Sequence, residues 1–190
     1  MKVFFFILIY MKPDAQFESK NGKLFSIKNR CELTTENLIQ ADIAGTDPAI
    51  LASDDFARKF SRAAKSIICA CVAWKMIELV PGSYNESYLA SLREFLKKTE
   101  ALGISAIIVP VTEGCAVGAE FERYTEAMVH TARRIKDCES VIGFALPDEV
   151  AADSANIASF IEAMSVKHAQ YVYFSAQKCS NSTIIPYRMR

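Results

Sequence analysis

The sequence is poor in the residues that several common catalytic centres require. Its 190 residues include only two histidines, His130 and His168. One lies in a predicted helix and the other just before a predicted strand, away from the expected site, which argues against a Ser-His or a His-metal centre. The chain also lacks G-x-G-x-x-G, P-loop and G-x-S-x-G motifs, so nucleotide, phosphate and hydrolase sites built on them are not supported. We expect no cofactor and no metal.

An excess of charge of either sign is also absent. The 22 lysine and arginine residues balance the 22 aspartate and glutamate residues, and no basic run stands out. A nucleic-acid-binding surface requires a concentration of positive charge to meet the phosphate backbone. Nucleic acid is therefore not an expected partner.

Long apolar runs are limited to the N-terminus, where residues 3–11 follow Lys2. The run is too short for a membrane span of about 20 residues but fits the ~7–15 residues of a signal-peptide core, and Ala15 offers a small residue for cleavage. The alternative is a buried strand. We predict a signal peptide over residues 1–15, a single domain over 16–190, and a secreted or extracytoplasmic chain without a membrane span.

Six cysteines are scattered along the chain, and a domain of this size does not need disulfides for stability. Cys69 and Cys71 fall on the same side of a predicted strand. A lone C-x-C without a second cluster or a nearby histidine is a weak metal signal. We interpret these cysteines as packing residues.

Periodicity predicts a hairpin followed by alternating helices and strands. Asn21-Gly22 separates two short segments and is typical of a two-residue hairpin turn, after which a first core strand is expected near residues 31–33 and a long loop over 34–53. Four amphipathic helices then alternate with four apolar strands. The first two helices begin near residues 53 and 85, and the third and fourth carry apolar stripes over residues 121–135 and 157–164. The strands cover 67–74, 104–111, 141–146 and 171–175.

Apolar strands between amphipathic helices indicate an α/β protein with a parallel sheet covered by helices. An open sheet and a (β/α)8 barrel both satisfy this pattern. A complete barrel typically needs about 250 residues, so periodicity alone favours the open sheet.

Polar residues follow most of the predicted strands, where parallel α/β folds build their sites. Several carboxylates and one tryptophan there suit a sugar, which needs hydrogen-bonding groups, an apolar platform and acid/base carboxyls. Each residue also has a simpler interpretation: Asp148 and Glu149 as a solvated helix start, Trp74 as core, and Glu113 as an ordinary loop acid. The residues concerned are Glu32, Trp74, Lys75, Glu113, Asp148, Glu149 and Ser175.

Three segments of the sequence resemble family 5 glycoside hydrolases, the cellulase and endoglycoceramidase group. Residues 17–28 resemble their N-terminal hairpin, residues 72–89 the segment after their second strand, and residues 141–150 their fourth-strand motif with an Asn-Glu-Pro triplet. The resemblance implies a truncated (β/α) barrel of four to five βα units with an N-terminal β-hairpin. It also implies Glu149 as the acid/base residue, with Asp148 and Val150 in place of the asparagine and proline.

The sequence departs from this family at three functional positions. It lacks the arginine usual in the second strand and the histidine usual after the third, and it ends before the seventh strand, which carries the nucleophile glutamate. We expect a glycoside-hydrolase-like protein that is incomplete or inactive as this chain, hydrolysing O-glycosyl bonds only if active. The alternatives are a non-catalytic domain that binds carbohydrate or protein, and an unrelated α/β domain.

The resemblance also defines the expected contacts. Glu149 is the candidate catalytic residue, and Asp148, Trp74 and Glu113 are the candidate substrate-binding residues. The expected partner is a carbohydrate or glycoconjugate. A truncated barrel leaves two strand edges unpaired, which predicts a homodimer through these edges.

Overall fold

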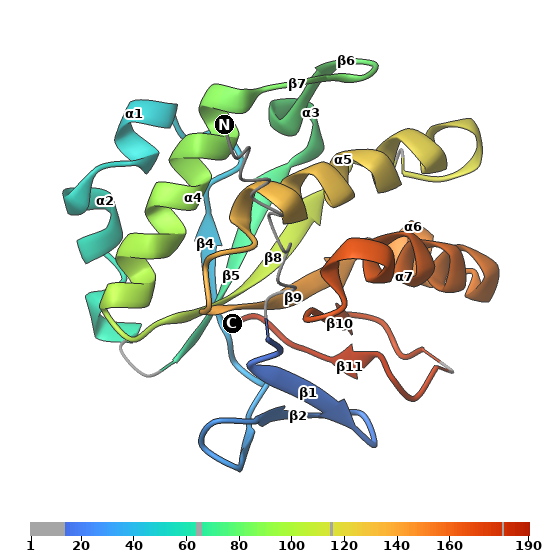
Figure 1. Ribbon diagram of the computed structural model, residues 1–190, viewed down its shortest axis with the longest axis horizontal. Coiled ribbons are helices and arrows are strands. Elements are labelled where there is room, and N and C mark those ends of the chain that lie inside the picture. Colours follow the sequence, from blue (N-terminus) through green and yellow to red (C-terminus); the bar gives the residue numbers. More distant parts are fainter. Residues whose placement is uncertain (1–13, 64–65, 115, 180) are drawn as a thin grey trace, which may run out of the picture.

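A six-stranded parallel sheet forms the centre of the molecule in a computed structural model that describes residues 14–63, 66–114, 116–179 and 181–190 (Figure 1). Residues 1–13 of the expected leader therefore lie outside the described residues. The strand order is β11-β10-β9-β8-β5-β4. These strands are β4 (Ile39–Asp42), β5 (Ile67–Ala73), β8 (Ser105–Val111), β9 (Val141–Leu146), β10 (Val172–Ser175) and β11 (Ile185–Pro186).

Three long helices cover the outer face of this sheet (Figure 1). They are α4 (Glu86–Ala101), α5 (Phe121–Ile135) and α7 (Ser154–His168). The Asn85 side chain caps the start of α4 by accepting a hydrogen bond of 3.0 Å from the Tyr88 amide, and Gly103, at φ +73°, follows its end. Shorter elements between β4 and β5 are α1 (Pro48–Leu51), α2 (Asp54–Arg58) and the 3₁₀ turn η1 (Ser61–Ala63).

The N-terminal hairpin is confirmed, with β1 (Phe17–Lys20) and β2 (Lys23–Ser26) joined by Asn21 and Gly22 at φ 52° and 72°. Such positive φ values at both central residues are typical of a type I′ turn. The predicted first core strand is wrong, because β3 (Cys31–Leu33) pairs antiparallel with β2 and stays outside the parallel sheet. The first parallel strand is β4, which lies inside the predicted loop. It has only two apolar residues and polar neighbours, so its sequence pattern does not indicate a strand.

The buried side chains form two layers on opposite faces of the parallel sheet. The outer cluster lies between the strands and the helices and contains residues of α4, α5 and α7. The inner cluster is lined by alternate strand residues such as Cys69, Ile107 and Phe174, and Leu24 of the hairpin joins it. The inside of the curled sheet is thus a packed core, as in (β/α) barrels.

The C-terminal tail joins the two edges of the sheet. Its strand β11 pairs in parallel with β10, and Met189 then forms a parallel bridge with Leu38, directly before β4. Backbone hydrogen bonds of 2.9 Å from the Leu38 amide to the Arg188 carbonyl and 3.1 Å from the Arg190 amide to the Leu38 carbonyl fix this bridge. The edges that the sequence predicted to be open are therefore paired in part by the tail, which weakens the basis for a homodimer.

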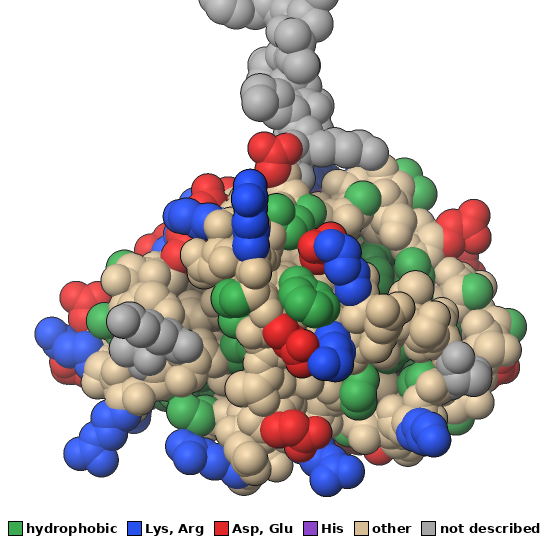
Figure 2. Space-filling view, turned by 90° about the horizontal axis from the view of Figure 1, so that it is seen from below, with side chains coloured by type: hydrophobic (Ala, Val, Ile, Leu, Met, Phe, Trp, Pro, Cys, Tyr) green, Lys and Arg blue, Asp and Glu red, His purple; other side chains and the backbone are tan. Residues whose placement is uncertain are grey.

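The face that carries the hairpin lies at the N-terminal ends of the parallel strands. Figure 2 shows side chains of both charges scattered over this face around small apolar patches. None of the helices in the described part of the chain has the length and hydropathy that crossing a membrane requires.

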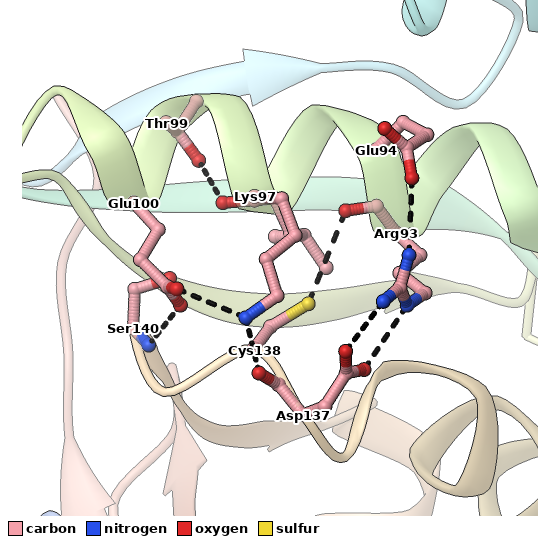
Figure 3. Close-up of polar contacts among 9 residues, drawn as sticks. Arg93, Glu94, Lys97, Thr99, Glu100, Asp137, Cys138 and Ser140 are labelled. Atoms are coloured by element: carbon pink, nitrogen blue, oxygen red, sulfur yellow. Dashed lines mark hydrogen bonds and ion pairs between the residues drawn. The ribbon is translucent and has the colours of Figure 1, made fainter.

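A polar clamp fastens α4 to the loop between α5 and β9 (Figure 3). The Arg93 guanidinium donates two hydrogen bonds to Asp137, of 3.1 and 2.5 Å, and Lys97 lies 3.0 Å from Glu100. Glu100 also accepts a hydrogen bond of 2.9 Å from the Ser140 amide. The clamp thus ties the loop that leads into β9 to α4.

Candidate functional site

Glu149 lies at the C-terminal end of β9, in the first turn of the short helix α6 (Asp148–Ala151). Its half-buried carboxylate accepts hydrogen bonds from the Thr112 hydroxyl, which follows β8, and from the Ala116 amide at 3.4 Å. The side chain is thereby held toward the loop between β8 and α5. Glu149 therefore places a carboxylate, held by two hydrogen bonds, at the end of β9, where the sequence predicted it.

Asp148 lies beside Glu149 in the chain but in a different environment. The Asp148 side chain is exposed. Burial raises the pKa of Tyr187, and the nearby thiols Cys69 and Cys71 and then the charge of Asp148 raise it further. Tyr187, Cys69 and Cys71 belong to the inner core. The charge of Asp148 therefore acts on the inner core, whereas Glu149 bonds to the β8–α5 loop.

Trp74 begins the short helix α3 (Trp74–Ile77) after β5 and is only 7% exposed. Its indole N–H donates a hydrogen bond of 3.1 Å to Glu78, the first residue of β6 (Glu78–Val80). Arg123 of α5 lies 3.1 Å from the same carboxylate oxygen, with its guanidinium carbon 5.5 Å from the indole ring centre. Gly82, before β7 (Ser83–Tyr84), donates its amide to the other Glu78 oxygen at 2.7 Å.

Tyr124 connects the Trp74 environment with Glu149. Its ring contacts the Trp74 ring edge-on, at 5.7 Å between centres and an interplanar angle of 79°. Burial, with a contribution from the Glu149 charge, raises the pKa of the Tyr124 hydroxyl. This buried hydroxyl has no hydrogen-bond partner among the residues that the structure describes.

A small cavity of about 150 Å³ lies at this rim between the ends of β5 and β8. It brings together the predicted residues Trp74, Lys75 and Glu113, with Glu113 ion-paired to Lys75. Thr112 also lines it, so the cavity and Glu149 share this neighbour. Two further acids on its wall, Glu78 and Glu120, are both ion-paired to Arg123.

Glu32 and Ser175, like Asp148, do not join this group. Glu32 lies on β3 of the hairpin sheet, where it pairs with Lys23 at 2.9 Å, because β3 is not a barrel strand. Ser175 does end β10, but it is fully buried and its hydroxyl accepts a hydrogen bond of 3.1 Å from the Gln177 amide. Asp42 takes the rim position at the end of β4, a strand that the sequence did not reveal.

Sequence reasoning missed Thr112, Glu78 and Arg123. Thr112 directly follows a predicted strand, so the rule that selected the other rim residues applies to it as well. Glu78 follows Trp74 by four residues, within a segment that gave no strand or helix signal of its own. Arg123 lies on α5, whose sequence signal is its apolar stripe and carries no information on this residue.

The thiols of Cys69 and Cys71 pack in the inner core, as predicted. Burial raises the pKa of Cys69 to about 12 and that of Cys71 to about 11, which favours the neutral thiol in both. The described residues contain no group of three histidine, cysteine, aspartate or glutamate side chains arranged to hold a metal ion.

Comparison with protein families finds no match, and comparison with curated proteins finds none either. Among solved structures, a GH5_18 protein of Bifidobacterium longum subsp. infantis, from glycoside hydrolase family 5, is similar over 74% of this chain and 42% of its own, with 8% identity and a TM-score of 0.52. The fold resemblance to family 5 glycoside hydrolases is confirmed.

Two other glycoside hydrolase structures share this fold over about half of their own length. The catalytic domain of a mannanase from Streptomyces sp. SirexAA-E is similar over 92% of this chain and 55% of its own, with 10% identity and a TM-score of 0.59. Endo-glycoceramidase II from Rhodococcus sp. is similar over 86% and 52%, with 12% identity and a TM-score of 0.57. This chain thus spans about half the length of these enzymes, and the likeness extends to the fold alone.

Proposed function

We propose that this half-barrel binds a β-linked carbohydrate at the rim formed by β5, β8 and β9, and that it does not itself cleave glycosidic bonds. The observation that carries the proposal is the position of Glu149, directly after β9 and held by Thr112 and the Ala116 amide. In (β/α) barrels the strand ends on this face build the site. The mannanase and endo-glycoceramidase with the same fold act on glycans or glycoconjugates, as their names state.

Chemistry at this rim favours binding over hydrolysis. Retaining hydrolysis needs a second carboxylate about 5–5.5 Å from the acid, ready to attack the sugar, and inverting hydrolysis needs one that activates water. The acids lining the cavity are Glu78, Glu113 and Glu120, and each is ion-paired with Arg123 or Lys75. A carboxylate engaged in this way is a poor nucleophile and a poor base. It still accepts hydrogen bonds from sugar hydroxyls at its remaining lone pairs.

Calorimetric titration of the full chain with mannotetraose and cellotetraose tests the proposal. We expect saturable binding that Glu149→Gln weakens about tenfold, the cost of losing a charge-assisted hydrogen bond. The matched control is Glu139→Gln, the same change at an exposed residue before β9, at the opposite end of the barrel. Equal affinities of the original chain and both variants for the glycan would show that Glu149 does not take part in binding.

A hydrolysis assay with the same glycans and with aryl β-glycosides separates binding from catalysis. We expect no reducing ends and no released aryl group beyond the background of Glu149→Gln. Release that Glu149→Gln abolishes would establish an active glycosidase, with Glu149 as its general acid.

A further inference from the structure

A second hollow lies far from the rim cavity, on the outer helical layer between α5 and α7. Its volume is about 520 Å³, within the range of small-molecule sites. Val129, Ala163 and Val166 give it an apolar wall, and Val166 is 64% exposed although it is a large apolar residue. At one side Tyr84 stacks on His130, with ring centres 4.0 Å apart and an interplanar angle of 17°.

Two buried polar side chains line this hollow without hydrogen-bond partners. Thr125 is 8% exposed and His168 is 3% exposed. The Thr125 hydroxyl and both ring nitrogens of His168 have no partner among the described residues. A buried polar atom without a partner costs free energy, and its presence in a folded protein calls for an explanation.

Positive charge lies near His168. Arg133 and Lys167 line the hollow and are exposed. Burial, followed by the charges of Lys136, Lys167 and Arg133, lowers the pKa of His168. Glu126 is the acid on the wall. These cations lie in the last turns of α5 and α7 or directly after them, where the helix dipoles stabilise positive charge. The dipoles do not account for the missing hydrogen-bond partners of Thr125 and His168.

We propose that the hollow between α5 and α7 binds a small molecule that carries a phosphoryl group. The Arg133 guanidinium and the Lys167 ammonium carry donors only, and the Thr125 hydroxyl and a neutral His168 imidazole can each donate one further hydrogen bond. Phosphoryl oxygens are acceptors that use several donors at once. Val129, Ala163 and Val166 provide an apolar surface for the remainder of the ligand. This site is independent of the glycan site proposed at the barrel rim.

The two histidines give a direct test by NMR, because the chain has no others and their ring C–H signals are resolved individually. The full chain is titrated with inorganic phosphate at constant ionic strength, balanced with chloride. A bound anion favours the protonated form of a nearby imidazole, so we expect the His168 pKa to rise with phosphate and to saturate. His130 also lines the hollow, with its ring nitrogen Nε2 2.9 Å from Glu86, so its signal reports a second contact with the ligand, and the reference is the Lys28→Gln variant.

Two variants assign the response to the hollow. Lys167→Gln and Arg133→Gln each remove an exposed cation and should weaken phosphate binding about tenfold. Lys28→Gln, the same charge change on the hairpin side, should leave the affinity unchanged. A His168 pKa that does not respond to phosphate, or responds equally in all three variants, would overturn the proposal. An equal response to acetate would overturn the preference for a phosphoryl group.

Discussion

The Trp74 indole and the Glu78 carboxylate are joined by a hydrogen bond of 3.1 Å, four residues apart in the chain. Glu78 has only 2% of its side chain exposed and also carries the ion pair with Arg123. A buried carboxylate is tolerated only when its oxygens are paired, and here both are. The indole N–H is thus directed at Glu78, so Trp74 presents little of its ring to a ligand in this arrangement.

Glu78→Ala should lower the free energy of unfolding by about 2–4 kcal/mol. The change leaves the Trp74 N–H without its acceptor and Arg123 without its buried partner. Urea denaturation gives the value directly. Glu94→Ala removes an exposed carboxylate paired with Arg93 and should cost less than about 1 kcal/mol. Similar losses for both variants would show that the buried network contributes no more than a surface pair.

Gly143→Ala should prevent normal folding of the sheet. A Cβ atom at Gly143 would lie 1.7 Å from the Val172 carbonyl oxygen of the neighbouring strand β10, and backbone atoms cannot yield by that much. We expect a loss of more than about 3 kcal/mol, measured by thermal unfolding, or insoluble protein. Gly45→Ala is the control, because a Cβ atom there meets nothing within 4 Å. A stable Gly143→Ala protein would contradict the pairing of β9 with β10.

Tyr187→Ala should destabilise the protein by about 3–5 kcal/mol, because it removes a large buried side chain from the inner core. The same substitution at Met189, which is 39% exposed, should cost well under half of that. Chemical denaturation of the two variants tests whether the tail packs as a strand of the sheet.

Because the tail pairs with both edges, we expect the full chain to be monomeric by light scattering, in place of the dimer that open edges favour.

The stability of the protein should decrease as the pH falls through about 6.5, partly because of His168. Its pKa in the folded protein is lowered, so in this range the unfolded chain binds a proton that the folded protein does not. His168→Gln removes this difference. Urea denaturation at pH 7.5 and 5.5 should therefore show a smaller loss of stability for His168→Gln than for the original chain. The same loss in both would assign the acid sensitivity to other groups.

The fold was predictable where the local pattern was strong. The bounds of β9 and α5 match the prediction because one is a continuous apolar run and the other carries a regular stripe. The strands β4 and β11 were missed because their pairing depends on partners far away in the chain, not on their own composition. Closure of the sheet by Met189 and Leu38 is a contact of this kind.

The candidate site was predictable in part, because strand ends in a parallel sheet can be located from the sequence. This placed Glu149 and Glu113 correctly at the ends of β9 and β8. The direction of each side chain could not be predicted, since it depends on partners such as Thr112 for Glu149 and Lys75 for Glu113. The buried Glu78–Arg123 pair joins two helix-strand units and has no local sequence pattern.

The most direct test of glycan binding at the rim is an NMR titration of the ¹⁵N-labelled full chain with mannotetraose and cellotetraose. We predict that the amide signals of Thr112, Ala116 and Glu149 shift in a saturable manner, that those of the opposite face around Glu139 do not, and that the glycan remains intact. Shifts confined to the opposite face, or none with either glycan, would contradict carbohydrate binding at the rim. Glycan cleavage that Glu149→Gln abolishes would contradict the absence of catalysis.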